Sequence, residues 1–142
     1  MRRSIRERNI LFLCRDNACL SQIAEAMAKH LSPPKIRIFS AGVKPQTIPP
    51  QVYKVMQELG ISLSGQSSKG VDQVPLDQID LVVSFDEADK DCKALPRKAK
   101  VTRWPAPKPS AGDPSLPKLR QDRDEIDKRV SALFLDYWRN IV

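Results

Sequence analysis

The sequence is poor in the residue types that mark several classes of protein, and each scarcity narrows the possibilities. Three cysteines in 142 residues give no even disulfide framework, so we expect a reducing compartment and a cytoplasmic protein. The single histidine, His30, and the cysteines form no cluster with metal-ligand spacing, so we expect no metal and no cofactor. Aromatic residues make up 6% of the chain, and no aromatic–basic platform or helix-turn-helix pattern supports nucleic-acid binding.

Long apolar runs are also missing. No stretch approaches the ~20 apolar residues of a membrane span, so we expect no membrane partner. The first apolar run, residues 10–13, is shorter than the ~7–15-residue core of a secretory signal. The length and the 41% hydrophobic fraction suit one domain, residues 1–142, with its own core.

Positive charge, in contrast, is plentiful. The net charge is +7 and the pI is near 9.5, a balance that favours acidic or phosphorylated partners. Part of this surplus precedes the first apolar run, at Arg2, Arg3, Arg6 and Arg8. We interpret residues 1–8 as a frayed, solvated basic arm.

The chain is organised around residues 10–27. Residues 10–13 are expected to form a buried strand, and residues 21–31 place Ile23, Met27 and Leu31 at helical spacing. The loop between them directs backbone N–H groups and the helix dipole into one concavity, where an anion would sit. The same field favours the thiolate of Cys14, the first loop residue. The alternative is an inert, buried cysteine.

Strands and helices alternate through the rest of the chain. We expect strands over residues 35–39, 80–84 and 99–103, and helices over residues 50–59, near Val71, over residues 87–95 and from Lys118 onward. The final helix should present a core face of Leu119, Ile126, Val130, Leu133, Phe134 and Tyr137. This order predicts an α/β three-layer sandwich with a four-stranded parallel sheet. Ligands in such sheets bind beyond the carboxyl ends of the strands, where the Cys14 loop, residues 84–86 and the Trp104 loop should meet.

Several segments resemble one family. They are Phe12-Leu13-Cys14 with Asn17, Cys19, Ser21-Gln22 and Ala24-Glu25; Ser40-Ala41-Gly42; Leu59-Gly60-Ile61; Gln66-Ser67-Ser68-Lys69; and Trp104 with residues 119–126. Together they are similar to the low-molecular-weight protein tyrosine phosphatases and the thioredoxin-coupled arsenate reductases. The resemblance implies that Cys14 is the nucleophile on a phosphomonoester or arsenate, and that Asn17 and Ser21 brace the loop and the thiolate.

The chain departs from the family where catalysis needs it most. The family loop runs Cys, five residues, Arg, and here Leu20 stands at the arginine position. The family's general-acid Asp-Pro pair corresponds to Lys108-Pro109, and an Asp-Pro occurs later, at Asp113. In the reductases two further cysteines relay electrons from a thioredoxin-like reductant; Asp86 stands at the first of these positions and Cys92 resembles the second.

The anion-binding residues predicted from the loop and its rim are Arg15, Asp16, Asn17, Ala18, Cys19, Leu20, Ser21 and Lys108. Two residues could replace the missing arginine and general acid. Arg15 could place its guanidinium over the loop, and Asp113 could act as the general acid. Lys108 would add positive charge at the rim, a change that fits binding better than turnover; the alternative is that it points to solvent.

The cysteines offer a redox role. In related phosphatases adjacent loop cysteines form a reversible bond, which would link Cys14 to Cys19; alternatively Cys19 packs under the loop. The sequence therefore leaves three hypotheses about function. The protein is a phosphatase or arsenate reductase of weak activity, or a catalytically impaired relative that binds phosphate or a phosphorylated partner. Nucleic-acid binding is the weakest of the three.

Overall fold

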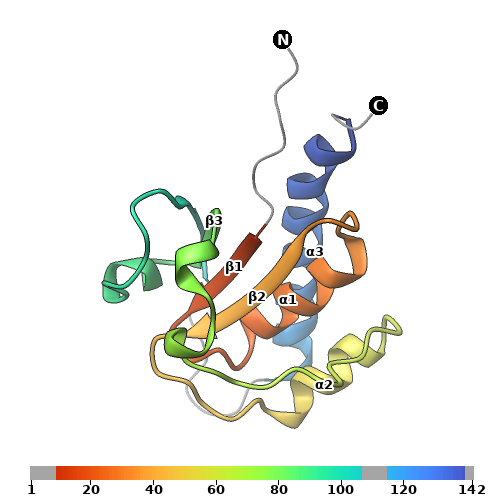
Figure 1. Ribbon diagram of the computed structural model, residues 1–142. Coiled ribbons are helices and arrows are strands. Elements are labelled where there is room, and N and C mark those ends of the chain that lie inside the picture. Colours follow the sequence, from red (N-terminus) through yellow and green to blue (C-terminus); the bar gives the residue numbers. More distant parts are fainter. Residues whose placement is uncertain (1–8, 107–114, 140–142) are drawn as a thin grey trace.

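The computed structural model describes residues 9–106 and 115–139 (Figure 1). Its strands are β1 (Asn9–Cys14), β2 (Arg37–Gly42), β3 (Leu81–Phe85) and β4 (Lys100–Trp104). The α-helices are α1 (Leu20–Leu31), α2 (Pro50–Gln57) and α3 (Leu116–Arg139), and short 3₁₀ helices are η1 (Val71–Gln73), η2 (Leu76–Gln78) and η3 (Ala88–Asp91). The predicted basic arm, Lys108 and Asp113 lie outside the described residues.

The four strands form one parallel sheet in the order β2-β1-β3-β4, which confirms the predicted α/β fold class. In β1, Ile10, Phe12 and Cys14 pack into one hydrophobic cluster, and Leu11 and Leu13 into another. Successive side chains of a strand point to opposite faces, so a central strand needs apolar residues at every position. That requirement explains the uninterrupted apolar run of β1.

The α-helices cover one face of the sheet. Apolar side chains of α1, α2 and α3 join the cluster that contains Ile10 and Phe12, and α1 and α3 lie side by side (Figure 1). The expected core face of α3 is buried at Leu119, Ile126, Val130 and Phe134, and Leu133 is partly buried. The side chain of Tyr137 lies outside the described part of the chain.

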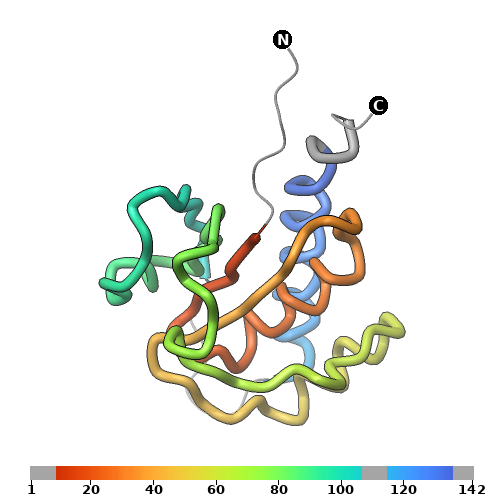
Figure 2. Tube along the Cα trace, viewed as in Figure 1, coloured from red at the N-terminus to blue at the C-terminus, as the bar shows by residue number. Residues whose placement is uncertain are grey.

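The opposite face of the sheet is covered by the segments that carry the 3₁₀ helices, drawn in green to teal in Figure 2. Val74, Ile79, Ala88 and Cys92 pack there against Leu11. The molecule therefore has the expected three layers, and one outer layer consists of short 3₁₀ helices and loops in place of α-helices.

Two predicted elements differ from the structure. β2 runs over Arg37–Gly42 and not residues 35–39, because Ser40, Ala41 and Gly42 pair with β1 although they carry no strand-like apolar alternation. The helix expected over residues 87–95 is reduced to η3. Before η3, Asp86 adopts a left-handed backbone conformation (φ 58°). The N–H of Asp89 then donates to Ser84 Oγ at 3.0 Å.

Among the described residues, no helix is both long enough and apolar enough to cross a membrane.

Candidate functional site

The loop that leaves β1 and enters α1 is held from outside through its carbonyl groups. Cys14 O accepts the N–H of Val43 at 3.1 Å, Arg15 O that of Lys44 at 2.6 Å, and Asp16 O that of Gln46 at 2.8 Å. Asn17 O accepts from Gln22 Nε2 at 3.0 Å. In a trans peptide the N–H points opposite to the C=O. The N–H groups that follow these carbonyls therefore point away from these partners. Two of them are donated within the loop, that of Asn17 to Cys14 Sγ and that of Ala18 to Asp16 Oδ1.

Asn17 fixes the turn of this loop. It is fully buried and adopts φ 48°, a left-handed conformation that asparagine tolerates better than most residues. Its Nδ2 donates to Ser21 Oγ and to Ser40 Oγ, both at 2.9 Å, and its Oδ1 accepts the N–H of Lys69 at 2.8 Å. One side chain thus ties the loop to α1, β2 and the segment after residue 65.

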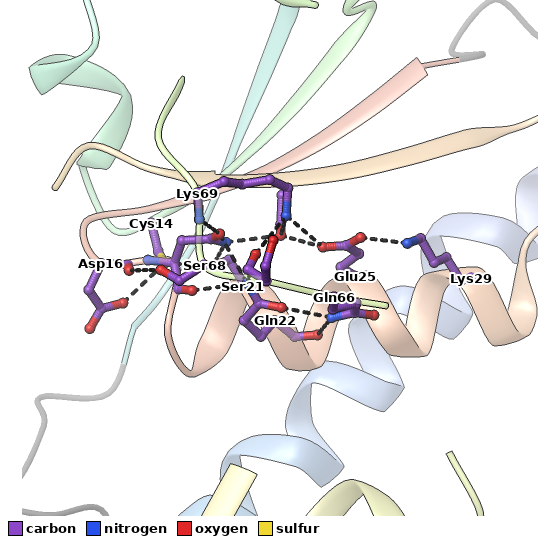
Figure 3. A network of polar contacts seen from close by, with 12 residues as sticks. Cys14, Asp16, Ser21, Gln22, Glu25, Lys29, Gln66, Ser68 and Lys69 are labelled. Carbon is purple, nitrogen blue, oxygen red and sulfur yellow. Dashed lines mark hydrogen bonds and ion pairs between the residues drawn. The ribbon is translucent and has the colours of Figure 1, made fainter. Parts of the chain in front are cut away.

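A polar network continues behind the loop (Figure 3). The Glu25 carboxylate, 4% exposed, accepts from Ser40 and is paired with Lys29 at 2.6 Å and Lys69 at 3.4 Å. Gln22 accepts from Gln66 at 2.8 Å. Sequence reasoning did not assign these roles; the motif around residues 66–69 was the available signal.

Gly42 brings β2 against the loop. A Cβ atom at this position would lie 2.7 Å from Asn17 N and 2.8 Å from Asp16 C, closer than real Cβ contacts. Only glycine therefore lets the end of β2 pass beside the loop backbone.

Cys14 is buried, with 6% of its surface exposed. Its Sγ accepts the N–H of Asn17 at 3.0 Å, contacts Ser21 Oγ at 2.7 Å, and lies 3.4 Å from Asp16 Oδ1. Burial raises the pKa of the thiol to about 11, the hydroxyl of Ser21 opposes this rise, and the negative charge of Asp16 adds to it. Loss of hydration thus opposes the predicted low-pKa thiolate, and the contacts with Ser21 and the N–H of Asn17 favour it.

Arg15 lies at the rim and does not fold over the loop. Its guanidinium is paired with Asp91, and its side chain is 64% exposed. The proposed compensation by Arg15 is thus not the arrangement that the structure has.

Leu20 and Cys19 mark the start of α1. Both are half-buried and pack against the helix-covered core, and Ala18 is buried. Burial raises the pKa of Cys19 to about 12, and the charge of Asp16 adds to the rise. Cys92 is buried in the cluster on the opposite face of the sheet. All three cysteines are free thiols.

The other two predicted corners lie at the same edge of the sheet as Cys14. The parallel register pairs Leu13 with Ser84 and Phe85 with Trp104. Trp104 packs on Phe12 and Phe85, with ring centroids 5.9 Å apart in both pairs. The N–H of Asp86 is donated to Trp104 O at 2.7 Å, and the Asp86 side chain is exposed. Within residues 9–106 and 115–139, no group of three or more His, Cys, Asp or Glu side chains is placed to hold a metal.

The fold and the loop define an α/β protein whose cysteine opens a backbone-lined loop at the carboxyl end of a central parallel strand. The model of the low molecular weight phosphotyrosine protein phosphatases matches residues 9–135, and the chain belongs to that family.

Several known proteins are similar to this chain over most of its length. "Arsenate reductase 1" of Staphylococcus haemolyticus is 33% identical over 125 residues, which cover 87% of this chain and 92% of the relative. A solved structure described as an arsenate reductase in the phosphate binding state is 30% identical, with a TM-score of 0.75, and the match covers 91% of this chain and 98% of that one. The YwlE arginine phosphatase from Geobacillus stearothermophilus, 23% identical with a TM-score of 0.78 over 92% of this chain and 93% of its own, shares the fold.

Proposed function

We propose that this protein is a catalytically impaired member of its family that binds a tetrahedral oxyanion in the Cys14 loop. The proposed ligands are phosphate, arsenate or the phosphate group of a phosphorylated protein. The proposed location is the cytoplasm. One observation supports the proposal: the carbonyls of residues 14–17 are anchored from outside, an arrangement that suits an anion cradle, while Leu20 occupies the position of the family's arginine.

Three features argue against efficient turnover. Leu20 cannot donate a hydrogen bond to the equatorial oxygens, and losing one preorganised transition-state donor costs about 10²–10³ in rate. Arg15, the nearest guanidinium along the chain, is engaged by Asp91. Burial raises the pKa of Cys14 to about 11, which disfavours the thiolate that a nucleophile needs. Each feature leaves binding by backbone N–H groups in place.

The second candidate is a weak phosphatase or arsenate reductase. The contacts of Cys14 Sγ with the N–H of Asn17 and with Ser21 Oγ favour it, since these donors would stabilise a thiolate once the proton has left. In this case Asp113 would be the general acid, and Cys19 and Cys92 would exchange electrons with a thioredoxin-like reductant. Asp86 at the first relay position counts against reduction, because a carboxylate cannot form the disulfide through which the relay passes its two electrons.

Hydrolysis of an aryl phosphate, measured beside vanadate binding, decides between the two candidates. The wild type should bind vanadate and hardly turn over. Leu20→Arg restores a bidentate donor and should raise turnover by something like 10²-fold, with binding tightened by ~1.5–3 kcal/mol at most. Leu20→Lys is the matched control: it supplies the charge without the planar fork and should recover less. Cys14→Ser should abolish turnover in every background.

Brisk turnover by the wild type, slowed by Leu20→Arg, would contradict the proposal and assign the cation role to another residue. Adding Lys108→Asp to Leu20→Arg should help only with poor leaving groups, where protonation limits the rate.

A further inference from the structure

The carboxylate of Asp16 contacts two of the loop's own donors. Its Oδ1 accepts the N–H of Ala18 at 3.1 Å. The same oxygen lies within 3.4 Å of Cys14 Sγ, whose thiol donates to it (Figure 3). The side chain is half-buried, and the carbonyl of the same residue is held by Gln46. An acidic side chain thus occupies donors that the proposed ligand would need.

Among residues 9–106 and 115–139, no lysine or arginine forms an ion pair with this carboxylate. Arg15 is paired with Asp91 at the rim, and Lys69 is paired with Glu25 behind the loop. On the side of α3, Asp122 adds a second negative charge that acts on Cys19 and is itself paired with Lys118. Leu20 and the thiol of Cys14 are neutral.

We propose that Asp16 is an internal anion of the loop, which an incoming ligand must displace, and that it selects singly charged oxyanions over doubly charged ones. The inference rests on the proposed oxyanion binding and deepens it by naming the charge of the ligand. Phosphodiesters and the monoanions H₂PO₄⁻ and H₂AsO₄⁻ belong to the favoured class. The dianions of phosphate, of arsenate and of a phosphomonoester belong to the disfavoured one.

Coulomb's law supplies the reason for this selection. The repulsion between the Asp16 carboxylate and a bound ligand doubles when the ligand carries two charges in place of one. The attraction of the backbone donors also grows with the charge of the ligand, and the Asp16 carboxylate offsets part of that gain for a dianion. In the family's pattern the loop arginine would counter the carboxylate, and here Leu20 leaves it uncompensated.

A purely structural role for Asp16 is the competing explanation, since the bond to Ala18 also shapes the turn. Two substitutions separate the roles. Asp16→Asn keeps an oxygen that can accept the N–H of Ala18 and removes the charge. Asp16→Ala removes both. Asp77→Asn makes the same change of charge at an exposed site on η2, before the amino end of β3 and away from the loop, and serves as the control.

Tungstate and perrhenate are suitable probes, because they are tetrahedral and isoelectronic and differ by one charge. Dissociation constants are measured by calorimetry at a mildly alkaline pH where neither ion changes its charge. Asp16→Asn should tighten tungstate about tenfold more than perrhenate, after screening by solvent is allowed for. Asp16→Ala should tighten both ions further by freeing the N–H of Ala18. Asp77→Asn should match the wild type.

A second readout needs no ligand in the loop. The rate of Cys14 alkylation by iodoacetamide, followed across pH with Cys19 and Cys92 replaced by serine, reports the pKa of the thiol. Asp16→Asn should move the midpoint downward, whereas a purely structural role would leave it in place.

The two readouts overturn the proposal in different ways. Equal gains for both ions in Asp16→Asn, an unchanged alkylation midpoint, or no binding of either ion to Asp16→Asn each contradict it. If Asp16→Asn binds tungstate with the expected preference and the wild type proves a brisk phosphatase, the impaired-enzyme proposal fails and the role of Asp16 stands.

Discussion

Cys14 and Cys19 belong to one loop, whereas Cys92 is buried under the opposite face of the sheet. Mild peroxide should therefore join Cys14 to Cys19 and leave Cys92 reduced. The reaction should be slow at neutral pH and faster in alkali, because the raised pKa values of both loop thiols leave little thiolate. Peptide mapping by mass spectrometry identifies the link.

Cys92→Ser is the control for this experiment and should leave the yield of the loop disulfide unchanged. A dominant link from Cys92 to either loop cysteine would show that the segment after β3 opens, and it would favour a working reductase relay.

Arg15 shows how little a residue's place in the sequence says about its charge interactions. It follows the cysteine directly, yet its partner Asp91 lies 76 positions along the chain. Because both side chains of this pair are exposed, the pair adds little to stability. Its main effect is positional: it keeps a guanidinium at the rim of the loop.

At the level of elements, the close approach of β2 to the loop makes Gly42 a sensitive position. In Gly42→Ala the new methyl group would meet backbone atoms of Asn17 and Asp16, which cannot rotate away. Overpacking of this kind costs typically ~1–3 kcal/mol, and here it should also weaken anion binding by shifting the cradle. Urea unfolding and a vanadate titration measure the two effects.

Gly70→Ala is the matched control, because Gly70 forms a β-bridge with Gly42. A Cβ atom there would meet the end of the Asp72 side chain at 2.7 Å, and that side chain can turn away. Its stability and binding should remain close to those of the wild type. An equal loss in both variants would mean that the sheet edge, and not the loop, is sensitive.

For the whole molecule, the two loop thiols predict a loss of stability in alkali. Burial raises the pKa of Cys14 to about 11 and that of Cys19 to about 12, against about 8.5 for a thiol in the unfolded chain. The folded state therefore keeps protons that the unfolded state releases. Their contribution is complete below about pH 8.5 and disappears as the pH rises through the folded pKa values.

The free energy of unfolding, measured in urea from neutral to strongly alkaline pH, should fall as the pH rises above about 8.5. A variant with Cys14→Ser and Cys19→Ser should fall less steeply, because lysines and tyrosines titrate equally in both proteins. Parallel curves would mean that these thiols ionise freely in the folded state.

The fold was predictable from the sequence in those elements whose burial requires apolar residues. The apolar runs of β1 and β3 are characteristic of central parallel strands, and the spacing of Ile126, Val130 and Phe134 marks the buried side of α3. The segment after β3 was misjudged, because Asp86 takes its left-handed turn through a bond to Trp104 that local propensity cannot reveal.

The site was predictable in its position and less so in its electrostatics. A strand–Cys–helix pattern placed the loop at the carboxyl end of β1, where it lies. The protonation of Cys14 and the direction of Arg15 depend on burial and on Asp91, which only the folded chain brings together. Lys108 and Asp113 lie outside the described residues, so their roles stay predictions.

The central place of β1 in the sheet has a consequence during protein synthesis. β1 can pair with β2 soon after both leave the ribosome, but its other edge is completed only by Leu81–Phe85. Until that stretch emerges, Cys14 is carried on a nascent chain that cannot yet enclose it. Its thiol then ionises near the ordinary value of about 8.5 and is far more reactive than in the finished protein. We therefore expect oxidants and electrophiles to modify this cysteine most readily in the interval before β3 appears.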